Sequence, residues 1–230
     1  MIFDKETSIV KFVRRPNRFQ GYVIIDGEEE LVHVPNTGRC REILIPGCRA
    51  LIRKETNPNR KTRFSLIGAY KGDKLINIDS QVPNKVVEEA LKNKKISGLE
   101  KYNIISREKT FGNSRFDFRL SNEEGEVYYL EVKGVTLEEH GLCRFPDAPT
   151  ERGRKHLLEL IEVKNNNYGA GVIFVIQMDG MKAFTPNKET DPEFAEALHR
   201  AAEAEVDIFA YECSVTETSI EIEKSIDIIM

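Results

Sequence analysis

The chain has 230 residues, of which 40% are hydrophobic and 31% are charged, a composition typical of one large or two small globular domains with a highly charged surface. Its formal net charge of −4 argues against wholesale electrostatic attraction to nucleic acid, while a local basic patch stays open. No apolar run reaches the ~20 residues that span a bilayer, and no apolar signal segment follows Met1, so we expect a cytoplasmic protein with no membrane partner.

Residues 1–80 consist of short strand-like segments that are separated by turn-forming Pro, Gly, Asn and Asp residues. No clear amphipathic helix interrupts them. A small closed barrel is the natural fold for such a segment, so we predict an OB-like β-barrel as the first domain. The predicted strands are Ile9–Val13, Gly21–Ile25, Leu31–Val34, Arg49–Arg53, Ser65–Tyr70 and Lys74–Asp79.

Basic residues concentrate in this first domain, and aromatic side chains lie between them. A barrel face of this composition suits single-stranded nucleic acid, because phosphates pair with arginine and bases stack on aromatic rings. The alternative is that the aromatic residues are core and the arginines are a solvated surface. The turn in Val32–Arg39, VHVPNTGR, is either an anion-binding loop with free N–H groups or an ordinary loop. The candidate nucleic-acid-binding residues here are Arg14, Arg15, Arg18, Asn36, Thr37 and Arg39.

Residues 81–230 alternate between helical and strand-like segments, in the order α-β-β-β-α-β-α-β-β. This order predicts a mixed sheet flanked by helices, so the fold class is α/β of the mixed α+β type, with domains at 1–80 and 81–230. Thr150 and Asp191 are predicted N-caps. The predicted helices are Asn84–Leu91, Glu151–Lys164 and Asp191–Glu205, and the predicted strands outside the hairpin described next are Tyr102–Glu108, Gly171–Gln177, Val206–Cys213 and Ser219–Ile222.

Two strand-like runs in residues 112–134 flank the turn-prone NEEG tetrad and predict a β-hairpin in which Asp117 faces Glu131. One face of this hairpin is then apolar, with Phe116, Phe118, Leu120, Tyr128, Leu130 and Val132. The other face is mostly charged, with Arg115, Asp117, Arg119, Tyr129, Glu131 and Lys133. The charged face is either a metal site with a lysine beside it or a salt-bridge ladder on a solvated sheet.

The order αβββαβ, with Asp117 and then Glu131-x-Lys133 on the hairpin, resembles the PD-(D/E)xK nuclease core, although the proline of the nominal motif is absent. Hydrolysis of a phosphodiester needs a hard cation such as Mg²⁺ or Mn²⁺, which prefers carboxylate oxygens. We therefore predict Asp117 and Glu131 as metal ligands, with Lys133 orienting or activating the attacking water.

Residues on the flanking helices are predicted to complete this site. Glu89, on the helix before the hairpin, is the candidate third metal ligand and catalytic residue. On the helix after the hairpin, His156 is a candidate catalytic residue, and Arg152 and Lys155 are candidate nucleic-acid-binding residues. Gln177, at the end of a buried strand, is a further candidate.

The stretches VHVPNTGR, RFDFRL, YLEVKGVTL and FPDAPTERGRKHLLEL together resemble the sugar fermentation stimulation protein A family, from about Arg18 through Cys213. That family is described as DNA-binding, associated with regulation of sugar (maltose) metabolism genes, and built from an OB-like domain joined to a PD-(D/E)xK nuclease-like domain. The resemblance implies nucleic acid, above all DNA, as the partner. It leaves open a metal-dependent nuclease or a non-catalytic DNA-binding transcriptional regulator. A protein or metabolite ligand and a homodimer stay open as well.

Overall fold

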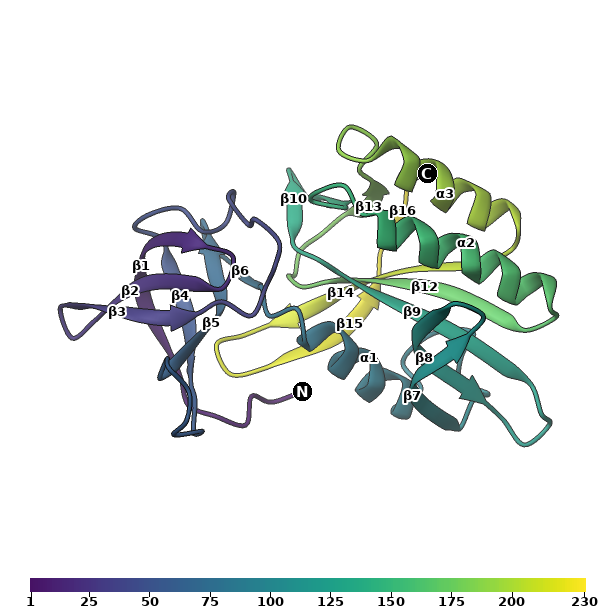
Figure 1. Ribbon diagram of the computed structural model, residues 1–230, viewed down its shortest axis with the longest axis horizontal. Coiled ribbons are helices and arrows are strands. Elements are labelled where there is room, and N and C mark those ends of the chain that lie inside the picture. Colours follow the sequence, from purple (N-terminus) through teal and green to yellow (C-terminus); the bar gives the residue numbers. More distant parts are fainter.

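The computed structural model describes residues 1–230, which form an N-terminal barrel and a larger part built on a mixed sheet (Figure 1). The barrel strands follow the order β3-β2-β1-β4-β5-β6, and a parallel bridge between β3 and β5 closes the sheet. Their bounds are β1 Thr7–Asn17, β2 Gln20–Ile25, β3 Glu28–His33, β4 Arg49–Lys54, β5 Phe64–Lys71 and β6 Lys74–Asn77. Each of the six predicted strands is present.

The main sheet of the second part has the strand order β15-β14-β12-β9-β8-β7. Strands β9, β12 and β14 are parallel to one another, whereas β7-β8-β9 and β14-β15 are antiparallel. The predicted fold class, a barrel followed by a mixed sheet with flanking helices, is therefore confirmed. The strands are β7 Ile104–Phe111, β8 Ser114–Ser121, β9 Val127–Val135, β12 Gly169–Ile176, β14 Asp207–Val215 and β15 Ile220–Ser225.

Three helices cover this sheet, with α1 (Val82–Lys92) on one face and α2 (Glu151–Asn165) and α3 (Pro192–Glu203) on the other (Figure 1). The predicted N-caps are confirmed, because Thr150 accepts the Gly153 N–H at 3.1 Å and Asp191 accepts the Phe194 N–H at 2.9 Å. None of the helices combines the length and the apolarity that crossing a bilayer requires.

A second, small sheet that the sequence did not predict runs along the edge of this part, in the order β10-β11-β13-β16. Its strands are β10 Leu137–Glu139, β11 Leu142–Phe145, β13 Ala183–Pro186 and β16 Asp227–Ile228. Segments this short carry no readable alternation. The sheet matters for the site because β11 leads directly into the loop before α2.

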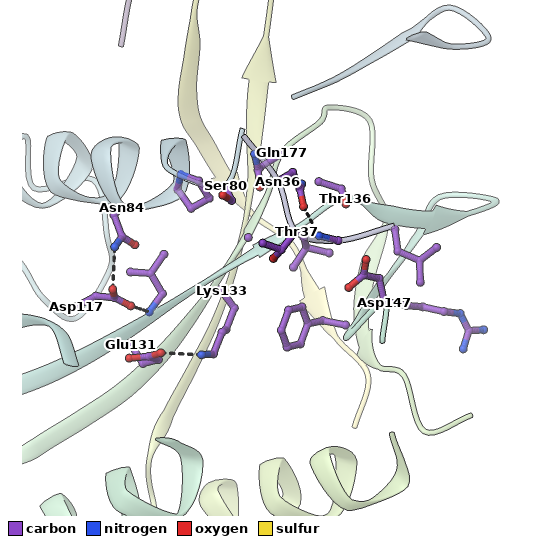
Figure 2. Close-up of a pocket in the computed structure, with 18 of the residues that line it drawn as sticks. Asn36, Thr37, Ser80, Asn84, Asp117, Glu131, Lys133, Thr136, Asp147 and Gln177 are labelled. Carbon is purple, nitrogen blue, oxygen red and sulfur yellow. Dashed lines mark hydrogen bonds and ion pairs between the residues drawn. The ribbon is translucent and has the colours of Figure 1, made fainter. Parts of the chain in front are cut away.

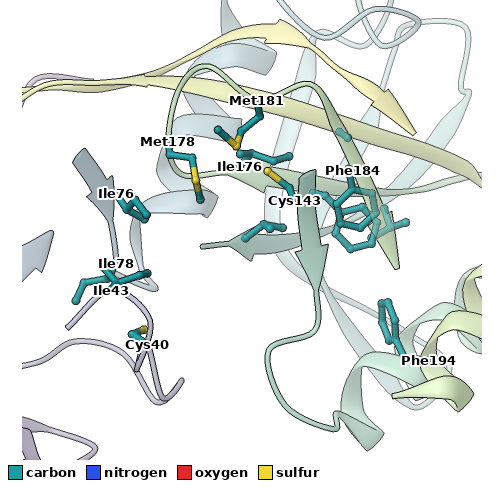
Figure 3. Close-up of a cluster of buried hydrophobic side chains, with 14 of the residues drawn as sticks. Cys40, Ile43, Ile76, Ile78, Cys143, Ile176, Met178, Met181, Phe184 and Phe194 are labelled. Atoms are coloured by element: carbon teal, nitrogen blue, oxygen red, sulfur yellow. The ribbon is translucent and has the colours of Figure 1, made fainter. Parts of the chain in front are cut away.

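The barrel and the larger part share one hydrophobic core (Figure 3). Ile43 and Ile78 of the barrel belong to the same buried cluster as Met178 and Phe184 of the larger part. Backbone and side-chain hydrogen bonds between Asn77 and Gln177 reinforce this contact. The two parts therefore pack as a continuous body, and any cavity between them has walls from both.

Candidate functional site

A cavity of about 350 Å³ lies between the barrel and the main sheet and contains Asp117, Glu131 and Lys133 (Figure 2). We call it the interdomain cavity. Its walls come from the barrel loop 36–38, the start of α1, the end of β9 and the loop between β11 and α2. The residues that line it include Asn36, Thr37, Gly38, Ser80, Pro83, Asn84, Asp117, Glu131, Val132, Lys133, Gly134, Arg144, Asp147, Arg152 and Gln177.

The hairpin that carries the carboxylates has the predicted register, with Phe118 opposite Leu130. Its backbone ladder stops there. Asp117 Oδ2 instead accepts the Val132 N–H at 2.8 Å, and Asp117 Oδ1 accepts the side-chain amide of Asn84 at 2.7 Å. The Asp117 carboxylate thus accepts a β9 backbone N–H beyond the last backbone pair of the hairpin. These two hydrogen bonds fix the carboxylate at the point where β8 and β9 separate (Figure 2).

The prediction that Phe116 shares the apolar face of Phe118 is wrong. Phe116 packs against Tyr129 and His156 on the α2 side, with ring centroids 5.8 and 6.0 Å away, whereas Phe118 belongs to the core under α1. Strand alternation is broken at Asp117, because its carboxylate turns to Asn84 of α1. The face of Tyr129 and Glu131 is also buried under α2 and is no solvated ladder.

Glu131 is 3% exposed and its two carboxylate oxygens differ in environment. Oε1 accepts hydrogen bonds from Lys133 Nζ at 2.6 Å and His156 Nδ1 at 2.5 Å, while Oε2 is buried and has no hydrogen-bond partner. Burial by itself raises the pKa of Glu131, but the hydrogen bond from His156 and the charge of Lys133 outweigh it and lower the pKa. Burial, together with the negative charge of Glu131, raises the pKa of Asp117.

These oxygens fit a hard divalent cation. A buried carboxylate oxygen without a partner is costly, and coordination would satisfy Glu131 Oε2. Each oxygen of Asp117 accepts one hydrogen bond and keeps a lone pair free. The structure contains no cluster of three or more acidic, His or Cys side chains suited to a metal. Mg²⁺ commonly binds with one or two carboxylates and fills its other positions with water and phosphate oxygens.

The structure does not bring Glu89 to this pair of carboxylates. Glu89 is paired with the amino group of Met1 at 3.0 Å, and its side chain is 44% exposed. The residue of α1 that reaches Asp117 is Asn84. Glu89 lies five positions later, a rotation of roughly 140° about the helix axis, so the two side chains point in different directions. The expectation that Glu89 completes the metal site is therefore not supported.

The three candidates on α2 occupy different environments. His156 is 5% exposed and contacts Glu131 from behind, outside the cavity lining, so it does not reach a phosphate there. Arg152 lines the cavity and donates a long hydrogen bond of 3.5 Å to His156 Nε2. Lys155 instead bonds the carbonyl of Asn113 at 3.2 Å and lies outside the cavity.

Gln177 lines the cavity, but its side-chain NH₂ is committed to the carbonyls of Asn77 and Asp79 and to the Asn77 side chain. A Cβ at Gly134 would lie 2.5 Å from Gln177 Oε1, which explains why a glycine follows Lys133. Gln177 thus shapes the cavity wall and joins the two parts of the molecule. We expect no direct contact of its NH₂ group with a ligand.

The sequence does not point to five polar residues of the cavity, namely Ser80, Asn84, Thr136, Arg144 and Asp147. The sequence pattern predicts Asn84 only as the start of a helix, and Asp147 lies in the loop that leads to the Thr150 N-cap. Asp147 borders the barrel loop so closely that a Cβ at Gly38 would be 2.8 Å from its Oδ2. An acidic residue three positions before a predicted N-cap is the one available signal for Asp147.

A second cavity of about 380 Å³, here called the basic groove, lies on the barrel and shares Thr37 and Gly38 with the interdomain cavity. No acidic residue lines it. Its charged residues are Arg14, Arg15, Arg18, Arg39 and Arg41. The predicted basic residues of the barrel therefore gather on one surface beside the carboxylates.

The five arginines of the basic groove differ in how far protein groups already engage them. Arg15 donates to the carbonyls of Arg18, Asn36, Gly38 and Arg39 at 2.7–2.8 Å and is a structural clamp. Arg14 is paired with Glu29 at 2.7 Å and lies over the ring of Tyr22. The exposed side chains that form no ion pair are those of Arg18, Arg39 and Arg41.

Comparison with known proteins identifies the family. The model described as the sugar fermentation stimulation protein RE domain matches residues 81–219, and that of the SfsA N-terminal OB domain matches residues 13–78. The chain belongs to the sugar fermentation stimulation protein family. Family members include homologs from Clostridium botulinum (strain Alaska E43 / Type E3), 74% identical over 99% of both chains, and Clostridium acetobutylicum, 64% identical over 100% of both. The predicted resemblance is thus confirmed.

A solved structure of this family is similar over the whole chain. It is Pyrococcus furiosus SfsA in complex with Ca²⁺, which is 30% identical and has a TM-score of 0.91. The match covers 100% of the present chain and 98% of the other. Barrel and mixed sheet are therefore arranged alike in the two family members.

Proposed function

We propose that this family member is a divalent-metal-dependent nuclease that hydrolyses phosphodiester bonds of DNA. The observation that carries the proposal is the state of Glu131, whose Oε1 is held by Lys133 and His156 while its buried Oε2 lacks a partner. Asp117 lines the same cavity. The Ca²⁺ in the Pyrococcus furiosus relative supports a hard cation, because Ca²⁺ also prefers oxygen ligands.

Each residue at the base of the cavity has a distinct role in this proposal. Asp117 and Glu131 would hold Mg²⁺ or Mn²⁺, together with the carbonyl of Val132. Such a cation neutralises phosphate charge and lowers the pKa of a bound water. Lys133, beside Glu131, orients the attacking water and offsets negative charge on the phosphate. Asn84 fixes the carboxylate of Asp117.

The cavity wall supplies positive charge for the substrate. Arg152 and Arg144, the latter paired with Glu139 at 3.6 Å, line the interdomain cavity, and the arginines of the basic groove adjoin it through Thr37 and Gly38. Arginine suits phosphate because its planar group can donate two parallel hydrogen bonds. These contacts support nucleic acid as the partner despite the net charge of −4.

A cleavage screen tests the nuclease proposal. Single-stranded, duplex and branched DNA and RNA are incubated with the full chain and Mg²⁺ or Mn²⁺. We expect Asp117→Asn and Lys133→Met each to reduce the cleavage rate by about 100-fold or more, because the first removes a charged ligand of the cation and the second removes the positive charge beside the phosphate. Asp73→Asn, at an exposed position outside both cavities, is the matched control. Absence of cleavage of every substrate with both metals would overturn the proposal.

A non-catalytic DNA-binding regulator is the second candidate, and one observation favours it. The basic groove lies on the barrel, and none of its residues hydrogen-bonds Asp117 or Glu131, so binding and cleavage are separable. Control of sugar metabolism genes, as the resemblance implies, would then follow from binding alone. In that case Asp117→Ala keeps full affinity for DNA, and that affinity falls steeply with salt.

A further inference from the structure

Glu131 and Lys133 of the interdomain cavity lie too deep for an intact duplex to reach them. The side chain of Glu131 is 4% exposed and that of Lys133 is 13% exposed. The barrel loop 36–38 and the start of α1 border one side of the cavity, and the β11–α2 loop borders another. A cation ligand must come within about 2.1 Å of the ion. The phosphate to be cut must therefore enter between these walls, where a paired second strand would collide with them.

The basic groove supplies a path for the strand that enters. No acidic residue lines it, and it meets the interdomain cavity at Thr37 and Gly38, which line both. Arg18, Arg39 and Arg41 are exposed and form no ion pair, so their charges are free to meet phosphates. A groove with three unpaired arginines beside a recessed site is the electrostatic pattern of a single-strand channel.

The loop between the two cavities is held in place. Three hydrogen bonds of Arg15 fix the carbonyls of Asn36, Gly38 and Arg39. The side chain of Asn36 also donates to the carbonyl of Ile78 at 2.7 Å. Ser80 Oγ also donates to the carbonyl of Pro35 at 2.8 Å. A loop anchored both by Arg15 of β1 and by the segment 78–80 that leads into α1 does not swing aside, so a strand has to cross it. At the crossing lies Thr37, which is exposed and whose N–H and hydroxyl donate to no protein acceptor.

We infer that the substrate is a single strand of nucleic acid that lies along the basic groove, crosses Thr37 and reaches Asp117 and Glu131 with one phosphate. This inference rests on the proposed nuclease function of the cavity. Thr37 and Arg39 donate to the phosphate at the crossing, and Arg18 and Arg41 hold the strand upstream. A duplex is a substrate only where it has a single-stranded tail or opens.

Binding measurements on the full chain test this path separately from cleavage. Asp117→Asn prevents cutting, and fluorescence anisotropy compares a single strand, a blunt duplex of the same sequence and a duplex with a single-stranded tail. Parallel arms use DNA and RNA. We expect the single strand and the tailed duplex to bind about 10-fold or more tightly than the blunt duplex, because only they can fill the groove.

Charge reversals locate the path. Arg18→Glu combined with Arg39→Glu should weaken single-strand binding by about 10-fold or more and flatten its dependence on salt, because two phosphate contacts are lost. Lys61→Glu is the matched control, since Lys61 is exposed on the same barrel and lines neither cavity. It should change affinity by less than about 2-fold. Thermal melts of each variant show whether the barrel remains folded.

Two results would overturn the path: equal affinity for blunt duplex and single strand, or full single-strand affinity in the folded Arg18/Arg39 double variant. Failure of the nuclease proposal looks different. If the wild type cuts nothing with either metal while single-strand binding depends on Arg18 and Arg39, the binding path is supported and the nuclease proposal is refuted. If blunt duplex is cut as fast as single strand, the nuclease proposal is supported and the single-strand path is refuted.

Discussion

His156 is the residue whose role the structure changes most. It lies behind Glu131, away from the cavity, and donates to the same Oε1 that Lys133 contacts. Its other ring nitrogen faces Arg152. His156 therefore acts as a positioning residue that holds one oxygen of Glu131, so that Oε2 is available to a ligand.

We predict that His156→Ala weakens Mn²⁺ binding by about 10–100-fold, the usual effect of removing a group that orients a metal ligand. His156→Asn should retain much of the affinity, because an amide N–H can replace the Nδ1 donor. Isothermal titration calorimetry with Mn²⁺ measures both, and Glu131→Gln gives the signal of a lost ligand. Wild-type affinity in a folded His156→Ala protein would refute the positioning role.

At the level of elements, the hairpin β8–β9 shows what sequence alone can predict. Its turn and its alternation define the register, so Asp117, Glu131 and Lys133 were found as a set. The predictions that were wrong concern residues whose positions depend on contacts between elements. Phe116 changed face because Asp117 bonds to α1, and the direction of Glu89 depends on how α1 is rotated about its axis. Neither is encoded in the periodicity of a single segment.

The sequence does not predict the small sheet of β10, β11, β13 and β16, for a different reason. They are two to four residues long, and they exist because neighbouring strands supply hydrogen-bond partners. The barrel strands, in contrast, carry their own alternation and turn residues, so all six were predictable. The structural role of Arg15 is likewise not predictable from the sequence. Its sequence environment is that of a surface arginine, and only the folded loop makes it a clamp.

The barrel also contains a buried ion-pair network that predicts acid sensitivity. The side chain of Glu55, which follows β4, is 4% exposed and contacts Lys5, Arg53 and Ser65. Burial alone raises the pKa of Glu55, but these hydrogen bonds outweigh it and lower the pKa to about 2. Because the pKa is lower in the folded protein than in the unfolded chain, the ionised form stabilises the fold at neutral pH. That stability is lost as the pH falls from about 5 toward 2.

We predict that Glu55→Gln lowers the free energy of unfolding at pH 7 by up to about 3 kcal/mol. It should also flatten the decline of stability between about pH 5 and 2. Denaturant titrations at several pH values measure both effects. Glu124→Gln, at an exposed position with no ion pair, should reproduce the wild-type curve. An unchanged pH dependence in Glu55→Gln would show that the network does not stabilise the barrel.

For the whole molecule, the decisive feature is that each part contributes different components of the site. Asp117, Glu131 and Lys133 all belong to the larger part, whereas Thr37 and the basic groove belong to the barrel. Gln177 joins them, because its buried NH₂ contacts Asn77 and Asp79. Loosening this joint should therefore affect substrate alignment without affecting the metal ligands.

We predict that Gln177→Leu lowers the free energy of unfolding by about 1–3 kcal/mol, since it removes the buried hydrogen bonds that the side-chain NH₂ of Gln177 donates to Asn77 and Asp79. Affinity for Mn²⁺ should stay within about 2-fold of wild type, because both carboxylates remain in place. Cleavage should fall through a higher KM, because the groove is no longer aligned with the cavity. Gln81→Ala is the control, because the amide of Gln81 is exposed, forms no side-chain cap hydrogen bond and lines neither cavity. Loss of Mn²⁺ binding as large as in Glu131→Gln would instead make Gln177 part of the metal site.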